Sequence, residues 1–134
     1  MTGLPQFNFP LFHAAAAALR SEGYDIVSPA EMDSPAVKAA AAKSTDGALD
    51  AQGKIAGETW GEILARDVRV IADNVDGIVF LPDWQKSRGA RLEAFVALLS
   101  GKTVYGYYVE GAQGALIRWA SPAYVRAIIA RNMP

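Results

Sequence analysis

Residues 77–101, GIVFLPDWQKSRGARLEAFVALLSG, decide the fold of this chain because they predict a strand, a loop and a helix in succession. The first five residues are mostly β-branched or aromatic and precede a proline, which is typical of a strand buried on both faces. Ser87 stands at the N-cap position of the following helix, and Gly101 at its C′ position. In an α/β protein, ligands bind at the carboxyl ends of the strands, so this loop and helix start are the expected floor of a site.

Length and composition indicate one globular domain over residues 1–134, because 51% of the residues are hydrophobic. The formal net charge of −1 provides no field that would collect polymeric nucleic acid. The chain has no cysteine, which excludes disulfides and thiolate nucleophiles and fits a reducing cytosol. Since no apolar run reaches the roughly 20 residues of a membrane span and no signal peptide is apparent, a cytoplasmic protein without membrane contact is expected.

Periodicity and capping signals place the remaining elements. Helices are expected at about residues 9–22, 35–43, 60–74 and 122–132, and strands at residues 24–28, 103–109 and 115–118. A glycine turn is expected at residues 111–114. The helix at 35–43 has Val37 as its single strong apolar residue, so we expect it at the periphery. Residues 44–58 carry three glycines and two aspartates without a period, which predicts a mobile loop or, alternatively, an active-site lid.

The helix at 60–74 carries an acidic residue on its apolar face. Thr59 and Glu62 form the S/T-x-x-E pattern of a capping box. At about 100° per residue, Trp60, Ile63, Leu64 and Ile71 share one face, Arg66 lies opposite, and Asp67 falls within the apolar face. A buried carboxylate loses hydration. Asp67 therefore either has a neighbouring partner, such as a backbone group or an arginine, or is a functional carboxylate facing a ligand cleft.

Glu93 is the second carboxylate of interest. On its helix, Leu92, Phe95, Val96 and Leu99 form the expected buried stripe, and Glu93 projects about a quarter turn away among small residues. By spacing alone it is a solvated helix residue or a group that faces a ligand. If both helices flank the strand between them, Asp67 and Glu93 point toward the same mouth of the sheet. Two carboxylates at one cleft are the arrangement used in glycosidic-bond chemistry.

Three segments resemble the nucleoside 2-deoxyribosyltransferase-like family, which includes deoxynucleoside monophosphate N-glycosidases and related phage and bacterial proteins. They are NFPLFHAAAAALRSEGYDIVSPAE, RDVRVIADNVDGIVFLPDW and SRGARLEAFVALLSGKTVYG, at residues 8–31, 66–84 and 87–106. The most specific motif is Ser87-x-Gly89-x-x-x-Glu93. The resemblance implies a flavodoxin-like three-layer α/β/α fold with a mainly parallel sheet, here without the usual N-terminal strand, and a homodimer.

The resemblance also implies roles for the residues that match the motifs. Glu93 is the nucleophile that attacks C1′ of the sugar, and Asp67 assists the departing base. Ser87 and Gly89 belong to the substrate-binding helix start, where Ser87 and the backbone amides suit a 5′-phosphate. Trp84 is a candidate for stacking on a base, with covering the sheet end as the alternative. The arginines Arg88 and Arg91 complete the expected substrate-binding set.

The expected function is cleavage or transfer at the N-glycosidic bond of a 2′-deoxynucleoside or its 5′-monophosphate. The alternative is a nucleotide-binding or regulatory module that keeps the fold without turnover. A third possibility is an interaction protein that associates through its Gly/Ala-rich helices. No cofactor is expected, since the chain has neither a P-loop nor a GxGxxG turn. No metal site is expected either, because His13 is the only histidine and stands without a second ligand in sight.

Overall fold

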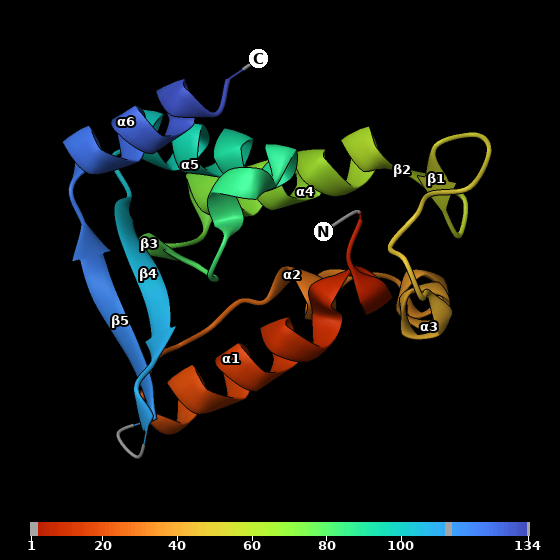
Figure 1. Cartoon of the computed structure of the whole chain (residues 1–134), viewed down its shortest axis with the longest axis horizontal. Coiled ribbons are helices and arrows are strands. Elements are labelled where there is room, and N and C mark those ends of the chain that lie inside the picture. Colours follow the sequence, from red (N-terminus) through yellow and green to blue (C-terminus); the bar gives the residue numbers. More distant parts are fainter. Residues whose placement is uncertain (1–2, 112–113, 134) are drawn as a thin grey trace. The chain divides into compact units, whose positions relative to one another are not determined.

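The computed structural model describes residues 3–111 and 114–133, which form a mixed α/β structure (Figure 1). The chain divides into two compact units, residues 1–65 and residues 66–134. Its helices and strands are α1 (Phe9–Ser21), α2 (Pro29–Met32), α3 (Pro35–Lys43), β1 (Lys54–Ile55), β2 (Glu58–Thr59), α4 (Trp60–Asp73), β3 (Gly77–Phe80), α5 (Arg88–Leu99), β4 (Thr103–Val109), β5 (Ala115–Ala120) and α6 (Pro122–Arg131). Two short 3-10 helices are η1 (Pro5–Asn8) and η2 (Trp84–Lys86). The expected turn at 111–114 includes residues 112–113, which lie outside the described residues.

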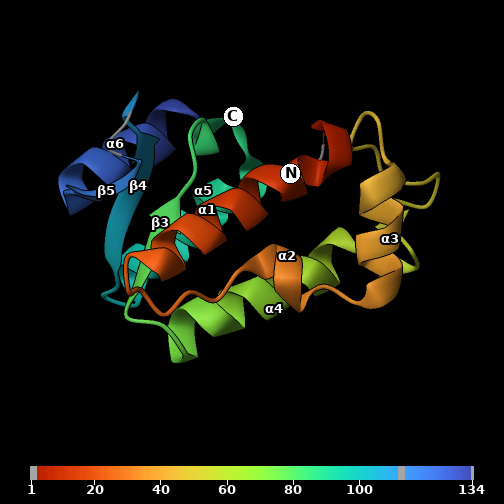
Figure 2. The ribbon, with the colours of Figure 1, turned by 90° about the horizontal axis from the view of Figure 1, so that it is seen from below.

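The first unit packs short helices and a small hairpin around its own core. Figure 2 shows α2 beside α1, and the two helices are in contact. The buried residues of this core are Phe7, Phe9, Ala30, Val37, Ala41 and Ile55. The expectation that α3 packs at the periphery is wrong, because Val37 is only 1% exposed. Alanines along α3 present little bulk, so the helix backbone can approach the core closely and bury Val37 completely.

The strand expected at residues 24–28 does not form. The segment has no strand partner within the described part of the chain, and Tyr24 and Val27 are exposed. Its backbone groups serve other partners: the Tyr24 N–H donates to the Leu19 carbonyl, and the Ile26 carbonyl accepts from Arg20 Nη2 at 2.8 Å. A β-branched run becomes a strand only where a ladder is available.

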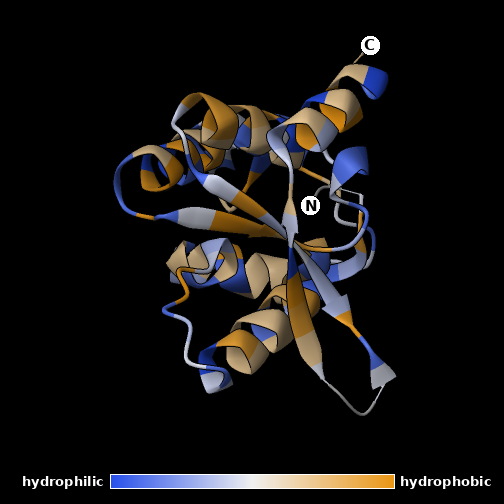
Figure 3. Ribbon diagram, turned by 90° about the vertical axis from the view of Figure 1, so that its left-hand side faces the viewer, coloured by the Kyte–Doolittle hydropathy of each residue, from blue (hydrophilic) through white to orange (hydrophobic). Residues whose placement is uncertain are grey.

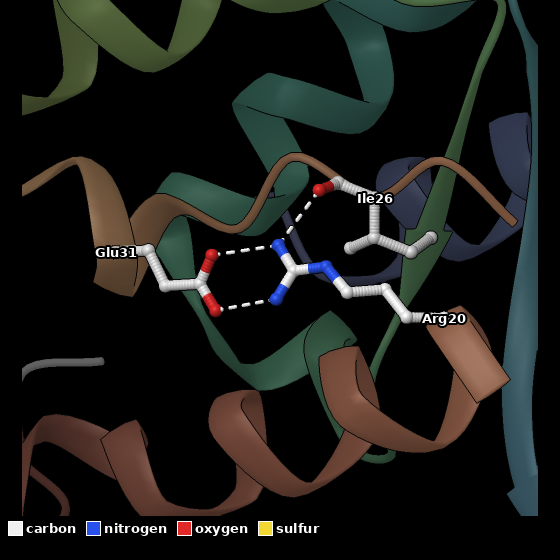
Figure 4. Close-up of polar contacts among 3 residues, drawn as sticks. All are labelled: Arg20, Ile26 and Glu31. Atoms are coloured by element: carbon white, nitrogen blue, oxygen red, sulfur yellow. Dashed lines mark hydrogen bonds and ion pairs between the residues drawn. The ribbon is translucent and has the colours of Figure 1, made fainter.

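Arg20 ties this segment to α2 (Figure 4). Its Nη1 and Nη2 atoms donate to Oε1 and Oε2 of Glu31, both at 2.7 Å, while Nη2 also reaches the Ile26 carbonyl. The two parallel bonds are the fork geometry in which a guanidinium binds a carboxylate most specifically. The hydrogen bonds from Arg20 hold the pKa of Glu31 below its ordinary value. Arg20 thereby fixes the path of residues 20–31 without a sheet.

Residues 44–58 contain local structure. The strands β1 and β2 pair antiparallel as Lys54 with Thr59 and Ile55 with Glu58, and Ile55 is buried. Asp50 Oδ1 accepts the N–H groups of both Gln52 and Lys54 at 2.9 Å, as expected of an aspartate that nucleates a turn. The segment is therefore a turn and a short hairpin. Its mobility and its role as a lid stay predictions.

The second unit is built on the three-stranded sheet β3-β4-β5. Strands β3 and β4 are parallel, with Phe80 opposite Gly106, and β5 runs antiparallel to β4, with Arg118 opposite Gly106. Figure 3 shows hydrophobic stretches along these strands. Helices α4, α5 and α6 contribute to the core around the sheet, whose buried residues are Ile71, Phe80, Ala94, Ala97, Val104 and Val125. The sheet is mixed, and its parallel pairing is limited to β3 and β4.

The buried face of α5 differs from the expected one. Leu92, Phe95 and Leu99 are exposed, with Leu99 at 73%, while Ala94 and Ala97 are completely buried. The prediction that the large residues form the packing stripe is therefore wrong for these three. Small side chains let α5 lie close to the sheet, so the alanines take the inner face. Within the described residues, no helix has both the length and the apolar character needed to cross a membrane.

Val37→Ala should lower the free energy of unfolding by about 1–3 kcal/mol, since it removes methyl groups from a fully packed site. Val27→Ala is the matched control, because it makes the same change in the same unit at an exposed residue. We expect it to change stability by less than about 0.5 kcal/mol. Urea unfolding followed by circular dichroism measures both. Equal losses in the two variants would contradict the burial of Val37.

Candidate active site

The loop between β3 and α5 is held by short-range hydrogen bonds. Ser87 has an extended backbone, and its Oγ accepts the N–H of Ala90 at 3.3 Å, which confirms it as the N-cap of α5. The Ser87 N–H donates to the Trp84 carbonyl at 3.0 Å, and Lys86 Nζ lies 3.1 Å from Asp83 Oδ1. The Ser87 hydroxyl accepts a hydrogen bond from a backbone amide and still has one hydrogen that it can donate to an anion.

Glu93 lies one and a half turns into α5 and is partly exposed. Burial raises the pKa of its carboxyl from the ordinary 4.5 to about 7, and the negative charge of Asp67 acts in the same direction. The positive charge of Arg66 acts in the opposite direction. Glu93 is therefore partly protonated near neutral pH, which is unusual for a glutamate on a helix surface.

Asp67 is buried on α4, with 8% of its surface exposed. Its Oδ1 accepts hydrogen bonds from Arg66 Nε at 3.0 Å and Arg66 Nη2 at 2.8 Å. The prediction of a buried acid on this helix is thus confirmed, and an arginine neighbour is among its partners. Arg66 was expected on the opposite, solvent-facing side. Its long side chain instead folds back to Asp67, because a buried carboxylate gains more from a charged donor than from any neutral group.

Asp67 and Glu93 are two carboxyl groups in different environments. Asp67 is held by a guanidinium, whereas burial and the charge of Asp67 both disfavour ionisation of Glu93. Acid, base and nucleophilic chemistry use pairs of acids whose environments give them different pKa values, so that one is protonated while the other is ionised. Both residues belong to the second unit, and the charge of Asp67 acts on Glu93, so the two selected carboxyl groups interact electrostatically.

The other expected substrate-binding residues cluster at the start of α5 but have structural contacts of their own. The Trp84 ring stacks on Phe80, with ring centroids 4.6 Å apart and an interplanar angle of 26°. Arg91 Nη1 donates to the Gln85 carbonyl at 2.8 Å and so braces the loop. Arg88, the first residue of α5, is exposed, and Gly89 follows it in the first turn. Their roles toward a substrate stay predictions.

Arg66 is the site residue that sequence reasoning missed. Helical projection placed it about 100° away from Asp67 and therefore on the other face. The available signal was the buried acid itself, since an aspartate on an apolar face requires a donor and Arg66 is the nearest cation in the chain. Within the described residues, no group of three or more His, Cys, Asp or Glu side chains is placed to hold a metal ion.

Replacing Glu93 by glutamine should stabilise the protein above neutral pH. Because the folded-state pKa of Glu93 is higher than its unfolded value, the folded protein binds more protons between about pH 4.5 and pH 7. The free-energy cost of ionising Glu93 in the folded protein is absent below this pH window, grows as the pH rises through the window, and reaches its full value above it. Glu93→Gln should therefore be more stable than the wild type by about 1–3 kcal/mol at pH 8 and by little at pH 4.

Urea unfolding at the two pH values measures this difference. Glu22→Gln is the matched control, because it makes the same change at an exposed glutamate. It should alter stability equally little at both pH values. If Glu93→Gln gives the same gain at pH 4 and pH 8, the gain does not come from ionisation of Glu93.

The comparison with known protein families covers most of the chain. Residues 1–106 match the domain of unknown function DUF4406. The match includes Asp67, Ser87 and Glu93 and ends within β4, at the residue that pairs with the end of β3. No curated protein and no solved structure is significantly similar to the chain. Because the match spans well over half of the sequence, the chain belongs to the DUF4406 family.

Proposed function

We propose that this protein cleaves or transfers the N-glycosidic bond of a 2′-deoxynucleoside or a deoxynucleoside 5′-monophosphate. The observation that carries the proposal is the pair of carboxyl groups, in which burial and the charge of Asp67 raise the pKa of Glu93. Glycosidic-bond chemistry uses two carboxyl groups with separated protonation. The Ser87-x-Gly89-x-x-x-Glu93 motif adds the resemblance to nucleoside 2-deoxyribosyltransferase-like proteins.

In the proposed reaction, a carboxylate oxygen of Glu93 attacks C1′ of the deoxyribose and forms a glycosyl ester. The bond from C1′ to the base nitrogen breaks, and its electron pair leaves with the base. The departing nitrogen takes a proton from a water molecule, which Asp67, held as a carboxylate by Arg66, orients by accepting its other hydrogen. Water then attacks C1′ in a hydrolase, or a second base does so in a transferase, and Glu93 is released. Attack requires ionised Glu93, so the active fraction grows as the pH rises toward and past about 7.

The start of α5 is the proposed phosphate site. The first turn of a helix offers N–H groups and the positive end of the helix dipole, both of which suit an anion. Ser87 already accepts from the Ala90 N–H and keeps a hydroxyl hydrogen for a phosphate oxygen. Arg88 is exposed on the same turn. Trp84 is the proposed stacking partner of the base, through the indole face that Phe80 does not cover.

The same resemblance supports the finer features of the proposal. These are a flavodoxin-like three-layer arrangement and a homodimer, in which each subunit carries one pair of carboxyl groups. A deoxynucleotide substrate is found inside cells, so a cytoplasmic location goes with this function. The alternative function, nucleotide binding without turnover, makes the same use of Ser87 and Trp84 but requires no ionised Glu93.

Glu93→Gln should abolish release of free base. We expect a loss of at least about 10³-fold in kcat/KM, because the amide cannot attack C1′. For Asp67→Asn we expect a loss of about 10²–10⁴-fold in kcat/KM.

The wild-type kcat/KM should rise with pH up to about 7, because the attacking form of Glu93 is the ionised one. Chromatography of reactions with a panel of deoxynucleosides and monophosphates measures the base. The opposite result is a wild-type protein that binds these compounds, as seen by a raised Tm, and releases no base. That result would contradict the enzymatic proposal and favour nucleotide binding without turnover.

Ser87→Ala should raise KM for monophosphates by about tenfold and leave KM for nucleosides unchanged, because it removes one hydrogen bond to the phosphate. Ser34→Ala is the matched control, since Ser34 Oγ caps α3 by accepting the Val37 N–H in the first unit. Both variants lose a cap worth about 1 kcal/mol. Equal KM increases for both substrate classes in Ser87→Ala would contradict phosphate binding and point to a damaged helix start.

A further inference from the structure

A cavity lies on the three-stranded sheet, lined by residues on both sides of the end of the family match. Its volume is about 400 Å³, within the range of pockets that hold small organic ligands. Five of its ten lining residues are aromatic, although aromatic residues make up only 10% of the chain. Asp67, Ser87, Gly89 and Glu93 are not among them. The carboxyl pair therefore does not form part of the cavity, and its proposed chemistry does not say which ligand the cavity would bind.

The register of the sheet shows how the cavity is built. Phe80, Gly106 and Arg118 stand opposite one another across the three strands and so share one face. Tyr108, two residues along β4, lies on the same face. A Cβ at Gly106 would lie 3.0 Å from Cε2 and 3.1 Å from Oη of Tyr108. Glycine at this position thus allows the Tyr108 ring to lie over the strand and form part of the floor.

The walls present aromatic surface that is open to a ligand. Trp84 comes from the loop before α5 and Tyr124 from the first turn of α6, whereas Trp119, next to Arg118 on β5, has its side chain on the opposite face of the sheet. Tyr108 and Tyr124 are both more than 40% exposed. Trp84 is fixed by its stacking on Phe80. Rings gathered around one cavity favour a flat ligand, because offset stacking and edge contacts both require planar partners.

Arg118 supplies the polar group of the cavity. Its Nη2 forms an ion pair with Glu110 Oε1, and its Cζ lies 5.2 Å from the centroid of the Tyr108 ring. Both contacts hold the guanidinium in place. A guanidinium has five N–H donors and no acceptor, so it favours a ligand with carbonyl or anionic oxygens at its edge. The same positive charge disfavours a cationic ligand, which aromatic cages would otherwise attract.

We propose that this cavity is a second binding site, for a planar heteroaromatic ligand that carries carbonyl or anionic acceptors at the edge of its ring. The ring stacks against Tyr124, and an acceptor at its edge meets Arg118. None of the proposed catalytic residues lines the site, and Trp84 is the one lining residue that also has a part in the proposed function. Theophylline, a soluble two-ring heteroaromatic with two carbonyl groups, is a suitable probe.

Binding of theophylline to the full chain is followed by the indole signals of the three tryptophans in NMR spectra. The signal of Trp84 should shift with saturation, while that of Trp60, in the first unit, should not. Tyr124→Ala and Arg118→Gln should each weaken binding by about tenfold. Tyr24→Ala, which removes an exposed tyrosine of the first unit, is the matched control and should leave binding unchanged.

Three outcomes would overturn the proposal. The first is the absence of any shift up to the solubility limit of theophylline. The second is tighter binding of tetramethylammonium or cyclohexanecarboxylate, which would exclude a planar ligand with acceptors. The third is loss of binding in Glu93→Gln, which would place theophylline at the carboxyl pair. Retained binding in Glu93→Gln supports a separate site whether or not the protein releases bases.

Discussion

The pairing of a buried carboxylate with an adjacent guanidinium is the constraint on which the site depends. An unpaired charge at the position of Asp67 would cost several kcal/mol, and Arg66 donates two hydrogen bonds to the carboxylate there. That retained charge, together with burial, then determines the protonation of Glu93. Arg66 thus acts on both acids, on Asp67 through hydrogen bonds and on Glu93 through its positive charge.

The parts of the structure that depend on neighbouring residues were predictable from the sequence. The capping box is formed as expected, with the Thr59 N–H donating to Glu62 Oε2 and the Glu62 N–H donating to Thr59 Oγ1. Ser87 caps α5 and Gly101 ends it with a positive φ of 68°. These bonds join residues three or four apart, so their partners are present in any window of the sequence. Asp67 was recognisable for the related reason that one acid interrupts an otherwise apolar helix face.

The features that depend on distant residues were not predictable. Residues 24–28 have the composition of a strand, yet a strand needs a partner that no local pattern supplies. The inner face of α5 was misjudged because periodicity locates a stripe of large residues but does not say which face the sheet will accept. Ala94 and Ala97 fill the close contact, and Val37 is buried for a similar reason. The three-layer arrangement and the roles of Ser87 and Trp84 toward a substrate remain predictions.

The central strand β4 has two halves with different neighbours. Residues 104–106 pair with both β3 and β5, whereas residues 107–109 pair only with β5. The family match ends at residue 106, where the pairing with β3 also ends. Substitutions in β5 and the distal half of β4 can therefore remodel the aromatic cavity without altering the strand that leads to α5. The carboxyl pair thus lies wholly within the family match, whereas the cavity takes residues from both sides of the boundary at which the match ends.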